Sequence, residues 1–164
     1  MGPFSVSDSP PQAIFDCNVF VQALMNPAGP AGACVQLALD RHIQLFFTRY
    51  ILDELQQMPD RPTPAKLGVS AAKVERLTAN LLITATWIDD VPHVFDHPVD
   101  PDDSHYLDLA VFTQTKLIVS RDRHLLGMND FAKPWSSDFR KRFFDLRVAS
   151  PEELLTMLQR EPHK

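Results

Sequence analysis

Apolar residues along the chain are grouped in short runs, separated by polar segments that contain most of the prolines and glycines. Short apolar runs bounded by such turn residues predict buried strands. We expect strands at residues 13–15, 43–47, 83–88 and 116–120, and a short fifth strand at residues 143–148. Between them, apolar residues recur at helical spacing, which predicts helices at residues 31–41, 70–81 and 104–113, after Thr48, and from Ser150 onward.

This alternation of strands and helices predicts the fold class. Parallel strands need long crossover connections, and helices usually supply them. We therefore expect an α/β fold, a three-layer α/β/α sandwich with a mainly parallel sheet of four to five strands. A flexible tail at residues 1–11, followed by one domain over residues 12–160, accounts for nearly the whole chain.

Two aspartates follow predicted strands directly. Asp16 comes after the run at residues 13–15, and Asp122 lies just beyond the run at residues 116–120. In open parallel sheets, ligands bind outside the carboxyl ends of the strands, so both side chains are candidates for a catalytic crevice. Aspartate is equally favoured as the N-cap of a helix. The pattern alone leaves both roles open.

Further acidic positions are less specific. Glu54 lies in the amphipathic helix after Thr48, where a glutamate is most often a solvated surface residue. Asp100, Asp102 and Asp103 precede the helix at residues 104–113, where aspartates cap helices and complement the helix dipole. Capping does not require this many aspartates, so we expect at least one of them to have another role. The segment lacks the glycine and distant glutamate of an EF-hand loop.

The net charge of −5 argues against a protein that grips nucleic acid through overall positive charge. The charge is unevenly distributed: residues 89–108 contain seven aspartates and no lysine or arginine, and residues 121–147 contain seven basic and four acidic residues. An acidic pocket beside a basic strip suits a metal site that handles a phosphodiester. Two unrelated solvated patches would give the same charge pattern. The aromatics near residues 140–142 suit RNA stacking and core packing equally.

Cysteines and histidines argue against other kinds of site. Cys17 and Cys34 form neither a CxxC pair nor a disulfide framework, which is typical of buried thiols in a reducing cytoplasm. His93, His97 and His105 lack cysteine partners at zinc-site spacing. The first residues do not resemble a signal peptide, and no apolar stretch reaches 18 residues. We therefore expect a cytoplasmic protein with no membrane partner.

Four sequence blocks, in order, resemble the successive motifs of the PIN-domain superfamily: DCNVFVQAL, YILDELQQM, DPDDSHYLDLAV and LIVSRDRHLL. Their spacing, the Leu-Leu of the last block and the closing VASPEELLTML are similar to the bacterial branch that contains toxin components of toxin–antitoxin pairs. The likeness covers about residues 13–158. It implies a PIN-like sandwich and a Mg²⁺- or Mn²⁺-dependent ribonuclease that acts on single-stranded RNA. An antitoxin protein and a second copy of the chain, in a homodimer, are the protein partners that we consider.

The resemblance assigns catalysis and metal binding to four acids, Asp16, Glu54, Asp103 and Asp122, with Asp102 as the near alternative to Asp103. It implies weaker, substrate-positioning roles for Asn18, Asp102, Ser120 and Arg121. The chain departs from the family pattern in two places. Ser120-Arg121-Asp122 replaces the more usual Thr-Gly-Asp, and residues 128–143 form a longer link to the last strand. We expect both departures to alter substrate access without removing the acids.

Such a set of acids suits phosphodiester hydrolysis. Carboxylate oxygens are hard ligands for Mg²⁺ or Mn²⁺, and a bound metal lowers the pKa of its water and polarises the phosphate. Two carboxylates about 4 Å apart repel by roughly 4 kcal/mol at an effective dielectric near 20. If the four acids converge, we therefore expect raised pKa values in the metal-free protein and stabilisation by Mg²⁺ or Mn²⁺.

Two alternatives belong to other classes. The first is a non-catalytic PIN-like module that binds RNA or protein, although the presence of all four acids favours the enzyme. The second is a phosphatase of the haloacid-dehalogenase class, which also has an aspartate at the end of its first strand. That chemistry needs a second aspartate two residues later, where this chain has Asn18, so we set it aside.

Overall fold

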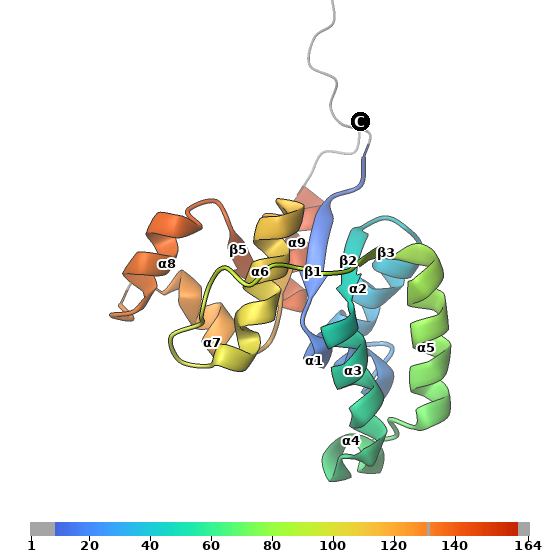
Figure 1. Cartoon of the computed structure of the whole chain (residues 1–164). Helices are drawn as coiled ribbons and strands as arrows, with labels where there is room; N and C mark the ends of the chain where they lie inside the picture. Colours follow the sequence, from blue (N-terminus) through green and yellow to red (C-terminus); the bar gives the residue numbers. More distant parts are fainter. Residues whose placement is uncertain (1–8, 131, 161–164) are drawn as a thin grey trace, which may run out of the picture.

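Five strands lie side by side in one parallel sheet, in the order β3-β2-β1-β4-β5 (Figure 1). The structure, a computed structural model, describes residues 9–130 and 132–160. The strand bounds are β1 Gln12–Phe15, β2 Gln44–Thr48, β3 Thr86–Ile88, β4 Leu117–Val119 and β5 Arg147–Ala149. The central strand β1 pairs with β2 on one side and β4 on the other, so that Ile14 is opposite both Phe46 and Ile118.

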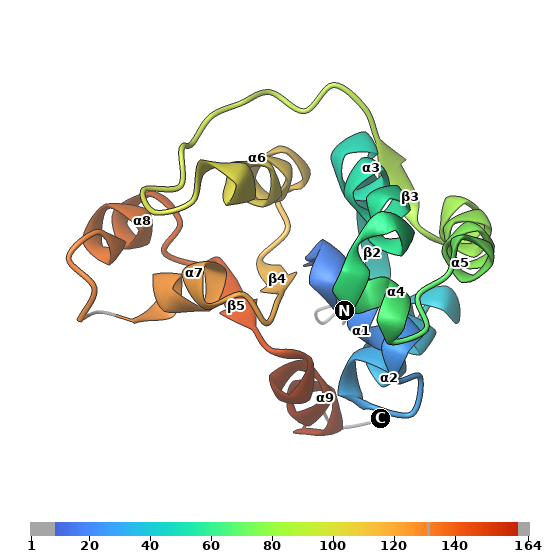
Figure 2. The same ribbon diagram turned by 90° about the horizontal axis from the view of Figure 1, so that it is seen from below.

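Helices cover both faces of the sheet, which confirms the predicted three-layer α/β/α fold. In Figures 1 and 2, α6 lies on one side of the sheet, and α2 and α9 lie on the opposite side. The helix bounds are α1 Cys17–Met25, α2 Pro30–Leu39, α3 Arg49–Gln57, α4 Pro62–Lys66, α5 Ala71–Thr84, α6 Ser104–Thr113, α7 Arg123–Leu126, α8 Ser136–Arg142 and α9 Pro151–Arg160. Short 3-10 helices occupy Met58–Asp60, Pro101–Asp103 and Gly127–Asn129.

Strands β1 and β2 are buried on both faces, as expected when helices cover each side of a parallel sheet, whereas β3 at the edge is half-buried. Consecutive residues Ile14 and Phe15 are fully buried although their side chains point to opposite faces. On one side, the ring centroid of Phe20 in α1 lies 5.9 Å from that of Phe15 and 6.0 Å from that of Phe47. Burying each of these rings contributes roughly 1.5–3 kcal/mol. The core therefore fixes α1 against the carboxyl end of β1.

Several elements differ from the sequence-based expectations. The predicted strand at residues 83–88 begins only at Thr86, because α5 continues through Thr84. Leu82 and Ile83 end that helix on its exposed side, so their apolar character does not mark a buried strand. Strand β5 likewise begins four residues later than predicted, at Arg147. The helices α1, α4, α7 and α8 were not predicted.

The connection from β3 to β4 reverses the direction in which strands are added. After β3, residues 89–100 arch over the molecule to α6, and the chain then enters the sheet again beside β1 (Figure 2). The strand order therefore reverses between β1 and β4. This is the position at which open α/β sheets form ligand-binding crevices.

The ends of the chain add two observations. Residues 1–8 of the predicted tail lie outside the described residues, and the carbonyl of Pro11 accepts a hydrogen bond from the Gln44 backbone N–H at 2.9 Å. Within residues 9–130 and 132–160, no helix combines the length and apolar character needed to cross a bilayer.

Candidate active site

Asp16 and Asp122 lie at the carboxyl ends of the neighbouring strands β1 and β4. The backbone N–H of Asp16 donates to the carbonyl of Val119, the last residue of β4, at 2.9 Å. Both aspartates also cap the helix that follows: Asp16 Oδ1 accepts from the Asn18 N–H at 3.3 Å, and Asp122 Oδ1 accepts from the His124 N–H at 2.7 Å. The capping role and the position at the crevice therefore coexist in both residues.

Two hydroxyl groups hold Asp16 in place. Ser120 Oγ donates to Asp16 Oδ2 at 2.7 Å, and it accepts from the Asp122 backbone N–H at 2.9 Å. The Tyr106 hydroxyl, from α6, donates to Asp16 Oδ1 at 3.1 Å and accepts from the Cys17 N–H at 3.0 Å. Ser120 and Tyr106 are both fully buried, so these bonds form away from water and fix the orientation of the carboxylate.

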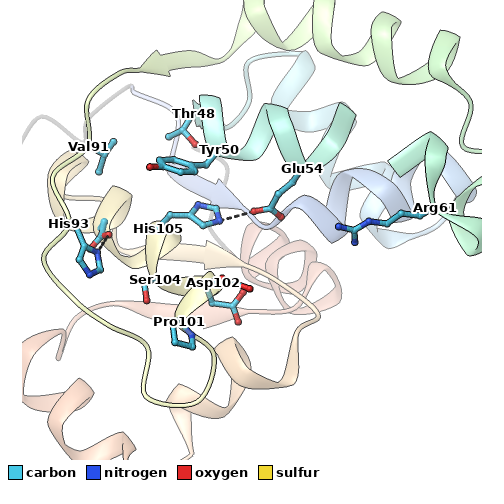
Figure 3. A pocket seen from close by; sticks show the side chains of 12 residues that line it. Thr48, Tyr50, Glu54, Arg61, Val91, His93, Pro101, Asp102, Ser104 and His105 are labelled. Carbon is cyan, nitrogen blue, oxygen red and sulfur yellow. Dashed lines mark hydrogen bonds and ion pairs between the residues drawn. The ribbon is translucent and has the colours of Figure 1, made fainter. Parts of the chain in front are cut away.

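Glu54 reaches the same network from α3. That helix begins at Arg49, and the preceding Thr48 caps it, because its Oγ1 accepts from the Ile51 N–H at 3.3 Å. Glu54 Oε2 lies 3.4 Å from the Tyr106 hydroxyl, and Glu54 Oε1 lies 2.8 Å from His105 Nε2. Figure 3 shows Glu54 and His105 pointing toward one another across the pocket. The glutamate that alone gave little sequence signal therefore points inward.

Asp103 and Asp102 differ sharply in environment. Asp103 is 8% exposed, and its Oδ2 is buried without a hydrogen-bond partner, whereas Asp102 is exposed. Burial raises the pKa of Asp103 to about 8, and the charges of Asp122, Asp100, Asp16 and Glu54 add to the effect in that order. Of the two candidates for the third acid, Asp103 is therefore the one whose pKa is raised by the charges of the other predicted acids.

Asp16 shows the same conflict between burial and charge. Burial raises its pKa, the hydrogen bonds from Ser120, Asn18 and Tyr106 oppose that rise, and the charge of Asp122 adds to it. The sheet edge thus brings all four predicted acids into one mutually repelling group. A bound cation would reduce the electrostatic repulsion among these carboxylates.

An open pocket of about 520 Å³ lies beside this group, between α3, α6 and the segment before α6. Glu54, Asp102 and Asp103 line it, whereas Asp16 and Asp122 do not. Figure 3 shows Arg61 extending toward the pocket from the side of α4. The complete lining is Thr48, Tyr50, Glu54, Arg61, Val91, His93, Pro101, Asp102, Asp103, Ser104, His105 and Asp108.

Comparison with known proteins matches residues 12–124 to the family model described as PIN domain. The chain belongs to the PIN domain family. Among solved structures, the crystal structure of VapBC2 from Rickettsia felis bound to a DNA fragment from their promoter is similar to this chain at 10% sequence identity. That match covers 85% of this chain and 98% of the other, with a TM-score of 0.48. No curated protein matches the sequence.

The donor groups of this PIN domain fit a divalent cation. Carboxylate oxygens are hard ligands that suit Mg²⁺ and Mn²⁺, and Asp103 Oδ2 is a buried oxygen with no protein partner. Ligand atoms of Asp100, Asp103 and His124 also lie within 4.8 Å of one another. The described part of the PIN domain therefore contains both the oxygen-rich group predicted from sequence and an adjoining cluster that includes an imidazole.

The weaker predicted positions are more scattered. Ser120 lies within the network, whereas Asn18 is exposed and contributes its backbone N–H to Asp16. Arg121 forms an ion pair with Glu152 of α9, so its cation is directed to that helix. Of the aromatics near residues 140–142, Phe139 and Phe143 are buried core residues, whereas Phe144 is 80% exposed. The Arg142 guanidinium lies over the Phe143 ring, 5.8 Å from its centroid.

Sequence reasoning did not assign four residues to the site that shape it: Tyr106, His105, Asp100 and His124. Tyr106 lies three residues after Asp103, on the same side of α6, so helical spacing could have indicated it. His124 follows Asp122 by two residues and carries no comparable signal in the sequence. It lies in the short helix α7, which was not predicted. The partners of His105 and Asp100 depend on the packing of segments that are distant in sequence.

Proposed function

We propose that this PIN domain is a divalent-metal-dependent ribonuclease that hydrolyses phosphodiester bonds in single-stranded RNA. The observation that carries the proposal is the convergence of Asp16, Glu54, Asp103 and Asp122 from different elements, with Asp103 Oδ2 left unpartnered in the interior. Bringing buried carboxylates together is unfavourable unless protons or a cation neutralise them. Strongly perturbed groups beside a pocket are typical of functional sites.

In this proposal the four carboxylates hold Mg²⁺ or Mn²⁺ at the edge of the pocket. When bound, the metal supplies a more acidic water and polarises the phosphoryl group. Tyr106 and Ser120 act as positioning residues, because their hydroxyls orient the two oxygens of Asp16. His105 positions Glu54 in the same way through its bond to Oε1.

The pocket also offers groups that suit a nucleotide. Tyr50 is 65% exposed at the rim, and its ring stacks on that of His105 with centroids 5.5 Å apart. Exposed aromatic rings provide stacking surfaces for unpaired bases, and a cation such as Arg61 suits a phosphate. These features support a single-stranded substrate, whereas the preference for RNA over DNA rests on the family resemblance.

The test compares cleavage of a labelled single-stranded RNA by the wild type and by Asp16→Asn, each with Mn²⁺ and with chelator. Asparagine still caps α1, so the variant removes the charge while keeping the helix start. We expect activity only in the wild type with Mn²⁺, and a loss on the order of 100-fold or more in Asp16→Asn. Asp53→Asn, which alters an exposed carboxylate beside Glu54, should retain activity.

Other outcomes identify the alternatives. Equal cleavage in all four conditions would reveal a contaminating nuclease and remove the evidence for an enzyme. Binding of the RNA by the wild type without cleavage in Mn²⁺ would favour the non-catalytic RNA-binding module. A DNA oligonucleotide of the same sequence tests the sugar: cleavage of the DNA at the same rate would contradict the ribonuclease assignment while preserving a nuclease.

The role of a toxin with an antitoxin partner stays a prediction that rests on the sequence resemblance. If the protein is a toxin, induced expression in a bacterial host should arrest growth, and Asp16→Asn at an equal protein level should not. Growth arrest by both proteins would attribute toxicity to something other than the acidic site. The homodimer stays a prediction in the same way, and its mass in solution tests it.

A further inference from the structure

A cluster of three side chains lies on the side of Asp103 that faces α7. Asp100 and Asp103 come from the segment before α6, and His124 comes from α7. One ligand atom from each of the three lies within 4.8 Å of the others. Asp103 is 8% exposed with an unpartnered Oδ2, and His124 Nδ1 is also a buried atom without a hydrogen-bond partner. Unpaired buried atoms of this kind are rare in folded proteins and require an explanation.

The spacing within this cluster suits ligands of a common ion better than direct hydrogen bonds. Within the cluster, His124 Nδ1 lies 3.5 Å from Asp100 Oδ2, and Asp122 Oδ1, outside the cluster, lies 3.6 Å from the same nitrogen. These distances exceed those of good hydrogen bonds between nitrogen and oxygen. Two ligands bound to one ion at about 2.1 Å, with bond angles between square and tetrahedral, are separated by roughly 3.0–3.4 Å. The three ligand atoms, which lie within 4.8 Å of one another, would move closer together to reach this separation around a bound ion.

A buried histidine ties the backbones of Asp100 and His124 together. His97 is 1% exposed, and its Nδ1 accepts hydrogen bonds from the N–H groups of Val99 at 3.1 Å and Asp100 at 3.0 Å. Because Nδ1 is an acceptor, the ring proton is on Nε2, which donates to the carbonyl of His124 at 3.1 Å. The neutral ring therefore links the two segments that carry the ligand atoms.

The side chain of Asp100 is oriented as well. Its Oδ1 accepts from the Asp102 N–H at 3.1 Å, which leaves Oδ2 directed toward His124. Outer groups that fix the orientation of ligands in this way are characteristic of built metal sites. The cluster thus combines a fixed backbone, an oriented carboxylate and two buried ligand atoms that have no hydrogen-bond partner.

We propose that Asp100, Asp103 and His124 form a second cation subsite that prefers a first-row transition ion such as Mn²⁺ over Mg²⁺. The imidazole is the reason, because nitrogen ligands favour transition ions, whereas Mg²⁺ prefers oxygen ligands and retained water. The inference deepens the proposed function, since Asp103 belongs to both groups of ligands. It adds Asp100 and His124, which are not among the four predicted acids, as metal ligands.

The test reads the ligands of bound Mn²⁺ directly. We expect pulsed electron paramagnetic resonance of the full chain with Mn²⁺ to show hyperfine coupling to one nitrogen. The coupling should disappear in His124→Ala, with an affinity for Mn²⁺, measured by calorimetry, that is lower by about 10-fold or more. His124→Asp should bind Mn²⁺ without the coupling, and with a smaller preference for Mn²⁺ over Mg²⁺. His42→Gln, which alters an exposed histidine outside the pocket and the cluster, should match the wild type.

Three results would overturn the subsite: no nitrogen coupling in the wild type, no Mn²⁺ binding at millimolar concentration, or coupling that persists in His124→Ala. Circular dichroism of each variant establishes that it is folded. Asp16→Asn separates this proposal from the proposed function, because it should lose RNA cleavage while keeping the nitrogen coupling. If the wild type shows the nitrogen coupling but cleaves no RNA, the subsite is supported and the nuclease is contradicted. If the wild type cleaves RNA without the coupling, the nuclease is supported and the subsite is contradicted.

Discussion

At the scale of single residues, Asp16 shows how one side chain serves the fold and the site together. Its Oδ1 caps the start of α1 by accepting from the Asn18 N–H, and its Oδ2 accepts from the Ser120 hydroxyl. The place of Asp16 at the end of β1 and its buried hydrogen bonds therefore fix the carboxylate. Asp103 differs, because no hydrogen bond holds its Oδ2. The arrangement therefore stabilises Asp16 locally and leaves Asp103 at an energetic cost that a cation would relieve.

Asp103→Asn should stabilise the metal-free protein. In chelator at pH 8, the substitution removes a buried charge that lies near Asp100 and Asp122, and burial already raises the pKa of this carboxyl to about 8. We expect the free energy of unfolding, from urea denaturation, to rise by on the order of 1 kcal/mol or more. Asp102→Asn, at the exposed neighbour, should change it by less than about 0.5 kcal/mol. A destabilised Asp103→Asn protein would show that the carboxylate has a stabilising partner.

At the scale of elements, four of the five parallel strands lead into a helix through a capping side chain. Asp16, Thr48 and Asp122 each accept from a backbone N–H of the helix that follows β1, β2 or β4. After β5, Ser150 Oγ accepts from the Glu153 N–H at 3.2 Å, and the Glu153 carboxylate accepts from the Ser150 N–H at 3.4 Å. These caps place polar groups at the same edge of the sheet, which is where the site forms.

Thr48→Ala tests the contribution of one such cap. Thr48 Oγ1 satisfies the Ile51 N–H at the start of α3, the helix that carries Glu54. Losing a threonine N-cap costs about 1 kcal/mol, so we expect a decrease of that size in the free energy of unfolding. Thr48→Ser keeps the hydroxyl and should lose less than half as much. If the two variants are equally destabilised, the methyl group and its packing are what matter at this position.

The segment before α6 depends on an ion pair that titrates. His93 lies between Asp108 and Asp96, at 2.7 Å from each, and Asp108 Oδ1 also accepts from the Val94 and Phe95 N–H groups. The hydrogen bond to Asp108 is the main cause that raises the pKa of His93 above 6.5, and Asp96 adds to it. Its stabilising effect is therefore complete below pH 6.5 and is lost as the pH rises through the raised pKa of the folded protein.

We accordingly expect residues 91–97 to lose protection from hydrogen exchange as the pH rises through that range, after correction for the intrinsic exchange rate. His93→Gln retains a donor for Asp108 but cannot become charged, so its protection should not vary with pH. The same pH dependence in His93→Gln would assign the effect to another group of the segment.

Sequence patterns predicted this architecture better than the contents of the site. Caps and strand ends are local, so Asp16, Thr48, Asp122 and Ser150 could be placed from neighbouring residues alone. The predicted strand at residues 83–88 was wrong in its first half because α5 continues through Thr84 with Ile83 exposed, and a linear pattern does not reveal burial. Contacts such as Glu54 with His105 join segments 51 residues apart, and only the fold reveals them.

At the scale of the whole molecule, the site depends on both halves of the sheet. Asp16 and Glu54 come from the side of β1 and β2, whereas Asp103 comes from the β3-to-β4 crossover and Asp122 follows β4. Buried residues from both parts belong to one hydrophobic cluster, which includes Phe47 and Phe139. Any loosening between the halves would therefore separate the acids as well as expose the core.

One cooperative unfolding transition is the expected result, because a single sheet and a single core join the two halves. The two tryptophans report on them separately: the ring centroid of Trp87 lies 5.7 Å from that of Phe47, and Trp135 lies 5.4 Å from His97. In Trp135→Phe and Trp87→Phe, the fluorescence of the remaining tryptophan should follow the same urea transition as the circular dichroism of that variant. If Trp135 changes before the helices unfold, residues 123–142 form a separate unit, and the prediction of one domain over residues 12–160 is wrong. The acidic group would then be assembled by docking two units, and its affinity for Mn²⁺ should fall at urea concentrations that leave most of the sheet folded.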